Sequence, residues 1–391
     1  MNNSNGNGST AVTELITMTN TSELLETQKT TKTKSKSRKT SVKVPKLIID
    51  AGSSNTKYYF EKEFGRFSSQ FKKFDTGLAP ENTLGVMTLG DSWYAFGDSV
   101  TSFPMGKTEY GYENDNKIKS LAVWVIAALT DHEYYLETLI RKDKSNKTIN
   151  FNLDITLLTL SAHRLDEIKG LLKEINFSYS GRKFKVTIKN IECLPEGFGA
   201  AKFAFDMINP TVKAKNRKRS KRLIEFSVLD LGGGTLTLTP YVSKGKLSAG
   251  KQQASSGCGL QTIKKLMAMK APLMADRGAT CFFNQGLMDA IETAKLNEDT
   301  TFHCEYIDGR HSIQLGEVLY ATLNDWANEI ESVSAILQQV ALLARRGQKI
   351  FLTGGGFEVS PIEKFVRDFI NNNKMVETLP DPGQINITGM K

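Results

Sequence analysis

The sequence predicts an α/β protein with two domains of like topology. Two stretches in different halves of the chain share one pattern, in which an apolar strand ends in an aspartate, small residues form a turn and a second strand follows. These stretches are Leu47 to Phe60, which contains Asp50, and Phe226 to Thr239, which contains Asp230. Further strands alternate with helices after each stretch, which is typical of a mixed sheet covered by helices. A duplicated α/β architecture is therefore expected.

The composition is that of an ordinary globular protein. The 391 residues are 40% hydrophobic and 24% charged, which fits two to three domains of roughly 150 residues each. The longest apolar run, Leu121 to Leu129, is much shorter than the ~20 residues of a membrane span, and the N-terminus shows no signal-peptide pattern. Four scattered cysteines without a C-x-x-C spacing fit a reducing compartment. We therefore expect a cytoplasmic protein without a membrane span.

The net charge of +9 is concentrated in two segments. Residues 1–44 carry +4 and Lys213 to Arg222 carry +7, so the rest of the chain is close to neutral. Residues 1–44 are rich in Asn, Ser, Thr and Lys and lack apolar periodicity, which predicts a disordered basic tail. Each basic segment is either a solvated extension or a contact site for a partner or an anionic surface. Direct sequence-specific binding of nucleic acid is not expected.

The first stretch has the residues of a phosphate-binding turn. Its small side chains let the backbone approach a ligand, successive N–H groups form an anion-binding concavity, and hydroxyl groups add donors. Lys57 would place an ammonium group on the phosphates, and Asp50 would hold a hydrated Mg²⁺. An Asp-X-Gly turn between strands is also common in ordinary hairpins, so this stretch alone leaves both interpretations open. The candidate ligand-binding residues are Gly52, Ser53, Ser54, Asn55, Thr56 and Lys57.

Two further glycine-rich stretches favour the ligand-binding interpretation. Adjacent glycines between strands weaken the sheet, and a backbone that must meet a ligand explains them better. Lys349 to Phe357 is again a strand that runs into glycines, and Ser360 to Glu363 has the pattern of a capping box with proline at the first helical position. This arrangement suits the nucleoside end of a nucleotide. The candidates are Gly232, Gly233, Gly234 and Thr235, and Gly354, Gly355, Gly356 and Phe357.

Together these motifs resemble those of the actin-type ATPases, the superfamily that includes actin, Hsp70 chaperones and sugar kinases. Asp50 to Lys57 is similar to its phosphate-1 motif, Asp230 to Thr235 to its phosphate-2 motif, and Leu352 to Phe357 to its adenosine motif. Within the superfamily the chain most resembles the ParM-type plasmid-segregation actins. The resemblance implies two RNase H-like (actin-type) domains that face a nucleotide cleft. The implied segments are domain I at 45–210 with an insertion at about 72–115, a basic linker at 211–222, domain II at 223–375 with an insertion at about 271–316, and a C-terminal segment at 376–391 that returns to domain I.

The resemblance also implies catalytic roles. Asp50 and Asp230 would approach the Mg²⁺ of a bound ATP through water. Glu196 stands where actin-like proteins place the residue that orients or deprotonates the attacking water, with Asp230 assisting. A carboxylate favoured by a helix dipole is the alternative for Glu196. Thr237 occupies a position where many relatives carry an aspartate, so hydrolysis is expected to be slow, or ATP acts mainly as a conformational ligand.

Two weaker resemblances complete the site. Ser256 and Gly257 precede a helix expected at Leu260 and resemble the segment that approaches the nucleotide sugar and phosphates, although a plain helix cap is equally consistent. Asn386 to Gly389 resembles the Asn-X-X-Gly turn of the second connection between the domains. The chain has no P-loop and no strand-linked dinucleotide fingerprint, and its histidines have no zinc-binding spacing. No metal other than nucleotide-bound Mg²⁺ is expected.

The resemblance implies a protein that assembles with itself into nucleotide-dependent filaments. An adaptor protein would link such filaments to plasmid DNA, or the filaments would serve as a bacterial cytoskeleton, with ATP or GTP as the nucleotide. A small-molecule, sugar-type kinase on the same fold is the alternative. Such a kinase requires a carboxylate base in a polar pocket, for which the sequence offers no convincing candidate.

Apolar periodicity predicts several connecting elements. One long helix is expected from Val318 to Ala344, with Gly347 as its C-terminal cap. A helix capped by Ser161 is expected to run from Leu165 to Ile175, and a strand is expected from Lys246 to Gln252.

Deleting residues 1–44 should leave nucleotide binding unchanged, because the tail lies outside the stretch that carries the motifs. Titration of the full-length and truncated chains with a fluorescent ATP analogue measures this. Loss of binding in the truncated chain would show that the tail is part of the fold.

Overall fold

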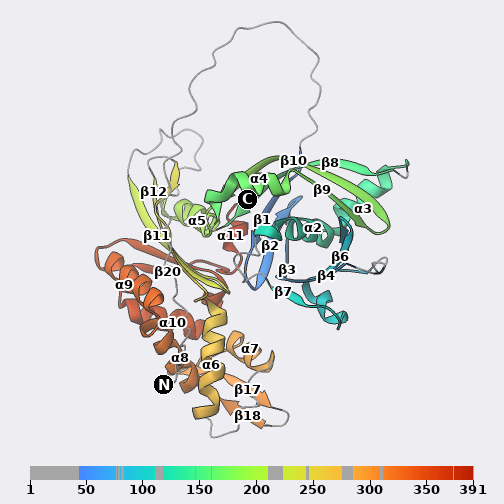
Figure 1. Ribbon diagram of the computed structural model, residues 1–391. Helices are drawn as coiled ribbons and strands as arrows, with labels where there is room; N and C mark the ends of the chain where they lie inside the picture. Colours follow the sequence, from blue (N-terminus) through green and yellow to red (C-terminus); the bar gives the residue numbers. More distant parts are fainter. Residues whose placement is uncertain are drawn as a thin grey trace, which may run out of the picture. The chain divides into compact units, whose positions relative to one another are not determined.

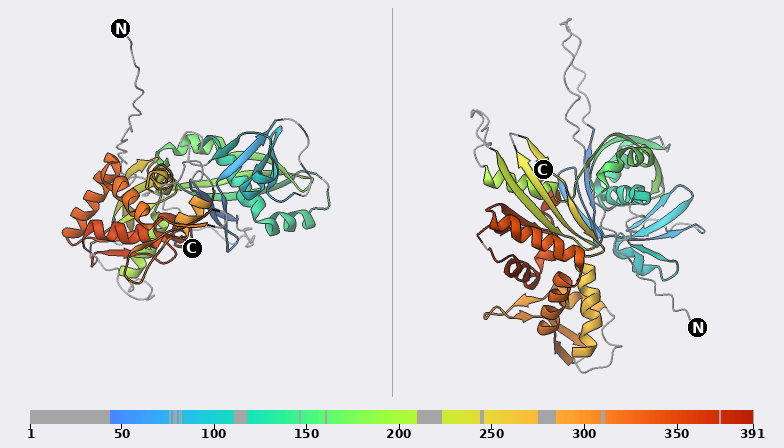
Figure 2. Two further views of the ribbon diagram at one scale, coloured as in Figure 1. Left: turned by 90° about the horizontal axis from the view of Figure 1, so that it is seen from below. Right: turned by 60° about the vertical axis from the view of Figure 1, so that its left-hand side comes forward.

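The structure is a computed structural model of the chain (Figures 1 and 2). It describes residues 44–75, 77, 80, 83–110, 118–145, 147–159, 161–209, 223–243, 246–274, 285–308, 311–372 and 374–390. The predicted basic linker at 211–222 and the predicted tail up to residue 43 lie outside these ranges. Within the described ranges, no helix has both the length and the apolar character needed to cross a membrane.

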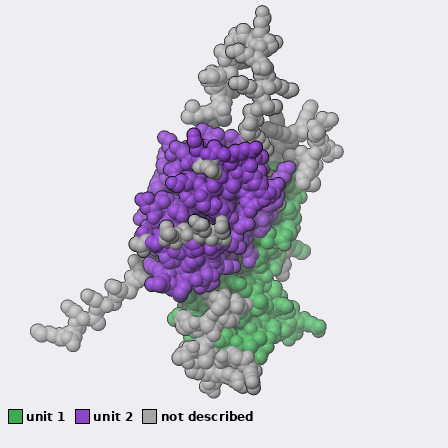
Figure 3. All heavy atoms as spheres, turned by 90° about the vertical axis from the view of Figure 1, so that its right-hand side faces the viewer, with its two compact units in different colours: residues 1–16, 200–385 green, residues 17–199, 386–391 purple. Residues whose placement is uncertain are grey.

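The described residues form two compact units (Figure 3). Unit 1 contains Ala200–Ile385, and unit 2 contains the described part of Thr17–Gly199 together with Asn386–Lys391. The boundaries fall inside two helices, α5 (Phe198–Ile208) and α11 (Ile385–Thr388). The domain limits expected from the sequence stay a prediction.

Unit 2 contains a ten-stranded sheet with a five-stranded core. In this core β1 and β2 form an antiparallel hairpin that β3 continues, while β8 and β10 extend the sheet parallel to β1, in the order β3-β2-β1-β8-β10. The core strands are β1 (Lys46–Ala51), β2 (Asn55–Phe60), β3 (Glu63–Ser68), β8 (Ile149–Leu158) and β10 (Arg182–Leu194). The sheet continues through β9 (Glu174–Tyr179), β5 (Val86–Leu89), β6 (Ser92–Phe96), β4 (Gln70–Phe74) and β7 (Thr108–Tyr110).

Alternating side chains on β1 and β2 decide what covers each face of this sheet. Leu47, Ile49 and Phe60 enter an apolar core shared with the helix α2 (Leu121–Asp131), which is buried along most of its length. Because successive strand residues point to opposite faces, Ile48 lies on the other side, where it packs with Ile387 of α11. The described part of this unit also contains the helices α3 (Glu133–Lys142) and α4 (Leu165–Leu172).

Unit 1 repeats the same strand order in a six-stranded sheet. β11 and β12 form an antiparallel hairpin that β13 continues, and β19 and β20 run parallel to β11, in the order β13-β12-β11-β19-β20; β14 also pairs with β12. The strands are β11 (Ile224–Leu231), β12 (Thr235–Ser243), β13 (Leu247–Ala249), β14 (Gln253–Ser256), β19 (Lys349–Thr353) and β20 (Val376–Thr378). The shared order and directions confirm the predicted α/β class with two domains of like topology.

Helices cover one face of the sheet in unit 1 (Figure 2). Leu229 and Leu231 of β11 and Leu236 and Leu238 of β12 share one apolar core with residues of these helices. The helices are α6 (Leu260–Met274), α8 (Gly316–Asn328), α9 (Glu331–Arg345) and α10 (Ser360–Ile370). Between α6 and α8 lie α7 (Gln285–Glu292), β15 (Lys295–Leu296), β16 (Phe302–His303), β17 (Glu305–Asp308) and β18 (His311–Gln314).

The prediction of one helix from Val318 to Ala344 is wrong, because the chain forms α8 and α9 there. Ile330 has an extended backbone (ψ 102°), and its carbonyl oxygen accepts from the N–H of Val333 (3.0 Å), which starts a new helix. Both helices bury the same apolar stripe, so the periodicity continues across the break. The predicted C-terminal cap is confirmed, since Gly347 has a φ of +81° and donates its N–H to Ala344 O (3.0 Å).

The predicted capping box at Ser360 is also wrong. Val359 is the N-cap of α10, and no side chain caps the helix. The Glu363 carboxylate accepts instead from Arg367 Nε (2.8 Å) and Thr378 Oγ1 (2.6 Å). An ion pair and a bond from β20 therefore occupy the group that a capping box would use.

Sheet pairing corrects two more predictions. The strand expected from Lys246 to Gln252 is shorter, because β13 ends at Ala249 and the next strand, β14, begins only at Gln253. The helix expected from Leu165 to Ile175 ends earlier, because Ile175 pairs with Val186 in the antiparallel β9–β10 hairpin. Ser161 precedes a short 3₁₀ turn without a side-chain cap. Partners distant in sequence decide these boundaries.

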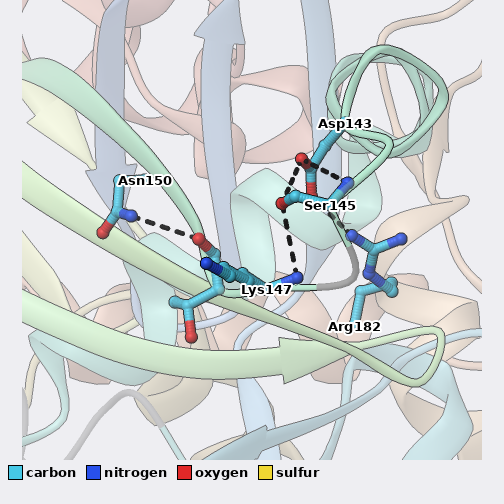
Figure 4. A network of polar contacts seen from close by, with 6 residues as sticks. Asp143, Ser145, Lys147, Asn150 and Arg182 are labelled. Carbon is cyan, nitrogen blue, oxygen red and sulfur yellow. Dashed lines mark hydrogen bonds and ion pairs between the residues drawn. The ribbon is translucent and has the colours of Figure 1, made fainter.

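A polar network joins the α3–β8 loop to the β9–β10 hairpin in unit 2 (Figure 4). The Asp143 carboxylate accepts from Ser145 N (3.1 Å), Ser145 Oγ (2.7 Å) and Arg182 Nη2 (2.6 Å). The hydrogen bonds from Ser145, with the charge of Arg182, hold the pKa of Asp143 below its ordinary value. The ionised carboxylate is therefore the form that the fold stabilises.

Replacing Asp143 with Asn should lower the melting temperature at neutral pH, and this effect should shrink as the pH falls below 3.8. The lowered pKa means that the carboxylate stabilises the folded state above the ordinary value of 3.8, and this stabilisation is lost as the pH falls through the lowered pKa. Thermal unfolding across this pH range measures the difference. Asp91→Asn, in the exposed β5–β6 turn, is the matched control, and a pH-independent loss in Asp143→Asn would contradict the prediction.

Candidate functional site

The first candidate turn joins β1 to β2 in unit 2. Asp50 is buried near the end of β1 (8% exposed) and lies directly across the hairpin from Lys57. Residues opposite each other in an antiparallel pair project to the same side of the sheet, so a carboxylate and an ammonium group lie on one side here. Gly52 begins the turn, where a Cβ atom would lie 2.5 Å from Asn55 O. The turn therefore requires glycine at this position.

Hydroxyl groups fasten this turn to the next strand. The Thr56 side chain is fully buried, and its Oγ1 shares a hydrogen bond with Ser69 Oγ (2.8 Å). The Ser54 carbonyl oxygen accepts from Ser69 N (2.8 Å), and Ser53 is buried as well. Thr56 thus anchors the predicted phosphate turn through its side chain.

Strand register brings Glu196 to the same edge of the sheet as Asp50. Asp50 pairs with Leu158 on β8, and Leu158 pairs with Leu194 on β10. Neighbouring strands are ~4.8 Å apart, so the Cα atoms of Asp50 and Leu194 are about 10 Å apart. Glu196 is half-buried two residues beyond Leu194, and Gly197 (φ +81°) turns the chain into α5. This position at a helix N-terminus fits both interpretations of Glu196.

The predicted Asn386–Gly389 segment packs close to Glu196. A Cβ atom on Gly199, in the first turn of α5, would lie 1.9 Å from Asn386 O. Ile387 is fully buried with Ile48 and Leu158 on the sheet face that also carries Asp50. The C-terminal segment therefore supports the edge of unit 2 that carries the candidate residues.

The second candidate turn joins β11 to β12 in unit 1. Asp230 is buried near the end of β11 (7% exposed), where it pairs with Thr237 on β12 and with Thr353 on β19. Thr237 Oγ1 is buried without a hydrogen-bond partner among the described residues. Burial, and secondly the charge of Asp230, raise the pKa of Tyr241, which lies further along β12. A row of buried polar residues thus crosses three strands of this sheet.

The N-terminus of α6 sets the orientation of the Gly232–Gly234 turn. Gly232 O accepts from Leu260 N (3.0 Å), and Gly233 O accepts from Gln261 N (2.8 Å). The C=O and N–H groups of a trans peptide point in opposite directions, so the N–H groups of Gly233 and Gly234 point away from α6. Successive N–H groups that point the same way form an anion-binding concavity. This turn can therefore bind phosphate oxygens.

Ser256 and Gly257 lie next to this turn. Ser256, at the end of β14, pairs directly with Thr235, the first residue of β12. Gly257 has a φ of +71°, and its carbonyl oxygen accepts from Thr262 Oγ1, so it leads the chain into α6. The structure brings the predicted Ser256–Gly257 segment and the predicted phosphate-2 turn together.

The three glycines after β19 have different surroundings. A Cβ atom on Gly354 would lie 2.3 Å from Asp230 Oδ1, and one on Gly356 would lie 2.4 Å from Leu231 Cδ2. For Gly355 the nearest atom in the described chain would be Glu358 Oε2, at 4.0 Å. Phe357 is 2% exposed and lies in the apolar core of unit 1. Of these predicted ligand residues, Gly355 has the most open surroundings.

The comparisons with known proteins show the fold. No protein-family model and no curated protein matches the sequence. Among solved structures, the archaeal actin homolog Ta0583 matches with a TM-score of 0.60 and 14% identity over 88% of this chain and 98% of that one. A 15-stranded ParM filament from Clostridium botulinum matches with a TM-score of 0.57 and 17% identity over 88% and 97%. The chain has an actin-like fold. Ta0583 in complex with ADP also matches, with a TM-score of 0.55 and 14% identity over 88% and 97%.

The actin-like fold confirms the predicted pair of actin-type domains and explains why the candidate aspartates occupy equivalent places. Asp50 is one residue before the end of β1, and Asp230 is one residue before the end of β11. These two strands hold the same place in the strand order of their sheets. Sequence reasoning missed Gly259 and Pro382. Gly259 touches the Gly232–Gly234 turn, and Pro382 O accepts from Gly354 N (2.8 Å). Glycine directly before a predicted helix was the available signal for the first, and no local signal indicated the second.

Replacing Gly259 with Ala should destabilise unit 1 by about 1–3 kcal/mol, the usual cost of overpacking. A Cβ atom there would lie 2.5 Å from both Gly232 O and Thr235 N, so α6 must move and its bonds to the turn must lengthen. Urea unfolding measures the change.

Gly170→Ala is the control for this substitution. Gly170 lies in α4 with no atom within 4 Å of its would-be Cβ, so alanine should be neutral or stabilising there. Equal effects of the two substitutions would contradict the close packing of α6 on the turn.

Proposed function

We propose that this protein binds ATP with Mg²⁺, hydrolyses it slowly, and assembles with itself into filaments. The observation that carries the proposal is the turn that follows Asp230, in which the N–H groups of Gly233 and Gly234 point away from α6. The actin-like fold supports it, because one matching solved structure is an ADP complex and another is a filament.

Each of the two turns would offer donors to phosphate oxygens in this proposal. Gly233 and Gly234 would donate backbone N–H groups to phosphate oxygens, with the Thr235 and Ser256 hydroxyls close by. The Gly52–Asn55 turn would do the same in unit 2, and the Lys57 ammonium would offset phosphate charge. Gly355, the least crowded glycine after β19, would lie nearest to the nucleoside.

The donor set suits Mg²⁺ held mainly by the nucleotide. Among the described residues, no group of three or more acidic, His or Cys side chains could hold a metal ion. Mg²⁺ is commonly bound through one or two carboxylates, substrate phosphates and water, and Asp50 and Asp230 would contact its water. When bound, it would neutralise charge on the phosphates. The chain itself supplies the carboxylates that orient this shell.

Glu196 would orient the attacking water and accept its proton. Its half-buried position beyond β10 lies at the edge of the sheet that carries Asp50, and Asp230 would assist from unit 1. Thr237 faces Asp230 with a neutral hydroxyl that cannot act as a base at neutral pH. A single carboxylate at this turn favours slow hydrolysis.

Slow hydrolysis suits a filament whose lattice loosens after turnover. ATP would stabilise the assembling conformation and hydrolysis would weaken it, as expected when a ligand binds two conformations with different affinities. In the cytoplasm such filaments would move plasmid DNA through an adaptor protein or form a bacterial cytoskeleton. Right-angle light scattering with ATP, ADP and a non-hydrolysable analogue tests assembly. Phosphate transfer to a sugar without polymer would instead identify a kinase.

Glu196→Gln should reduce phosphate release at least a hundredfold, since a positioned general base typically contributes 10²–10⁴-fold, while scattering with ATP persists.

Asp230→Ala should reduce both phosphate release and the Mg²⁺ dependence of ATP binding. Malachite-green assays and fluorescent-ATP titrations measure these effects.

Glu192→Gln is the control for Glu196, because Glu192 is an exposed acid on β10, the strand that precedes Glu196. Wild-type phosphate release in both Glu196→Gln and Asp230→Ala would remove the catalytic assignment.

A further inference from the structure

Gly354 touches the carboxylate of Asp230 in unit 1. It follows β19 directly and has a φ of +95°, in the left-handed region that favours glycine. A Cβ atom there would lie 2.3 Å from Asp230 Oδ1 and 2.4 Å from Leu231 O. The carboxylate therefore occupies the space that a side chain at residue 354 would need.

The backbone of Gly354 is held on both sides. Its N–H donates to Pro382 O (2.8 Å), and its carbonyl oxygen accepts from Phe357 N (3.1 Å). Thr353 Oγ1 donates to the same Pro382 oxygen (3.0 Å). Moving Gly354 away from Asp230 would break or lengthen these bonds. These hydrogen bonds therefore hold the backbone of Gly354 in place beside Asp230.

The cross-strand neighbours of Asp230 limit the directions in which its side chain can point. Its cross-strand partners on the two sides, Thr237 on β12 and Thr353 on β19, are both buried and β-branched. β-Branched side chains have few accessible rotamers, so they do not readily give way. Gly354 then closes the side beyond the strand end. Packing against these residues restricts the direction of the carboxylate.

We propose that Gly354 is a positioning residue for Asp230: its bare backbone directs the carboxylate, and any side chain there would turn the carboxylate aside. This inference rests on the proposed ATPase function. It gives Gly354 a role different from contact with the nucleoside, which the glycine-rich pattern alone suggested. Gly355 keeps the nucleoside role.

The two roles differ in what depends on Mg²⁺. A misdirected Asp230 weakens the interaction with the metal shell but leaves nucleoside contacts intact. Gly354→Ala should therefore raise the Mg²⁺ concentration for half-maximal phosphate release and lower kcat, each about tenfold or more. The affinity for ATP in EDTA should change less than threefold. Equal losses of affinity with and without Mg²⁺ would overturn the proposal.

Gly347→Ala is the matched control. Gly347 also has a left-handed backbone (φ +81°) and lies two residues before β19, but no atom lies within 4 Å of its would-be Cβ. It has a left-handed backbone as Gly354 does, but lacks the contacts to Asp230 Oδ1 and Leu231 O. Its kcat and Mg²⁺ requirement should stay within twofold of wild type, and a Mg²⁺ defect equal to that of Gly354→Ala would overturn the proposal.

A double-mutant cycle with Asp230→Ala tests whether the effect passes through the carboxylate. That change removes the oxygen nearest to the new methyl group but leaves Leu231 O, so Gly354→Ala should lower kcat by a smaller factor in this background than in the wild type. Effects of the two substitutions that multiply would overturn the proposal.

The same cycle, read out by thermal unfolding without nucleotide, separates this inference from the proposed function. The loss of melting temperature caused by Gly354→Ala should be smaller with Ala at residue 230 than with the native Asp. Equal losses would overturn the positioning role, whereas absence of ATP binding in the wild type would refute the ATPase and leave this measurement valid.

Thr353→Val provides a milder variant if Gly354→Ala does not fold. It removes the hydroxyl group that donates to Pro382 O. This weakens the attachment of residues 353 and 354 to Pro382 without adding an atom beside Asp230. An increased Mg²⁺ requirement in this variant supports the proposal, and a Mg²⁺ requirement equal to that of the wild type overturns it.

Discussion

The candidate site in unit 1 depends on two backbone hydrogen bonds from the start of α6 to the Gly232–Gly234 turn. The first N–H groups of a helix have no partners inside the helix, and here Leu260 and Gln261 donate theirs to carbonyl oxygens of the turn. These bonds satisfy the helix and, at the same time, turn the N–H groups of Gly233 and Gly234 away from it. Gly259 allows the approach, because a side chain there would collide with Gly232 O and Gly233 O of the turn and with Thr235 N at the start of β12. One contact therefore joins a helix, a turn and a sheet.

The duplicated strand order places the chemistry at the same point of both units. β1 pairs antiparallel with β2 and parallel with β8, and β11 pairs antiparallel with β12 and parallel with β19. The carboxyl end of each first strand therefore meets that of a neighbouring parallel strand. Asp50 and Asp230 stand at these ends. Both are buried beside polar partners rather than on open loops, Lys57 for the first and Thr237 and Thr353 for the second. Rigid strands thus hold the groups that proposed catalysis requires.

Local sequence was enough for the hairpins and for the class of fold, because each Asp-glycine turn and each apolar strand is encoded within about fourteen residues. It was insufficient where distant residues compete for one group. Glu363 has a good capping pattern, yet Arg367 and Thr378 take its carboxylate. Ile175 continues a helical period, yet Val186 pairs with it in a hairpin. The break at Ile330 is invisible to periodicity because α8 and α9 bury one continuous stripe. The site followed the same division: its turns were predictable, while the contacts of Gly259, Gly354 and Pro382 arise only in three dimensions.

Crowding around the glycines affects how related sequences should be compared. Gly259, Gly354 and Gly356 each lie against backbone or buried side-chain atoms within 2.5 Å of a would-be Cβ. Selection for folding alone would preserve them, even in a descendant that had lost its ligand. Folding does not require glycine at residue 355 in this way, since the nearest described atom to a Cβ there would be 4.0 Å away. Drift at residue 355, with its neighbours unchanged, would therefore be the more informative mark of a lineage in which activity has decayed.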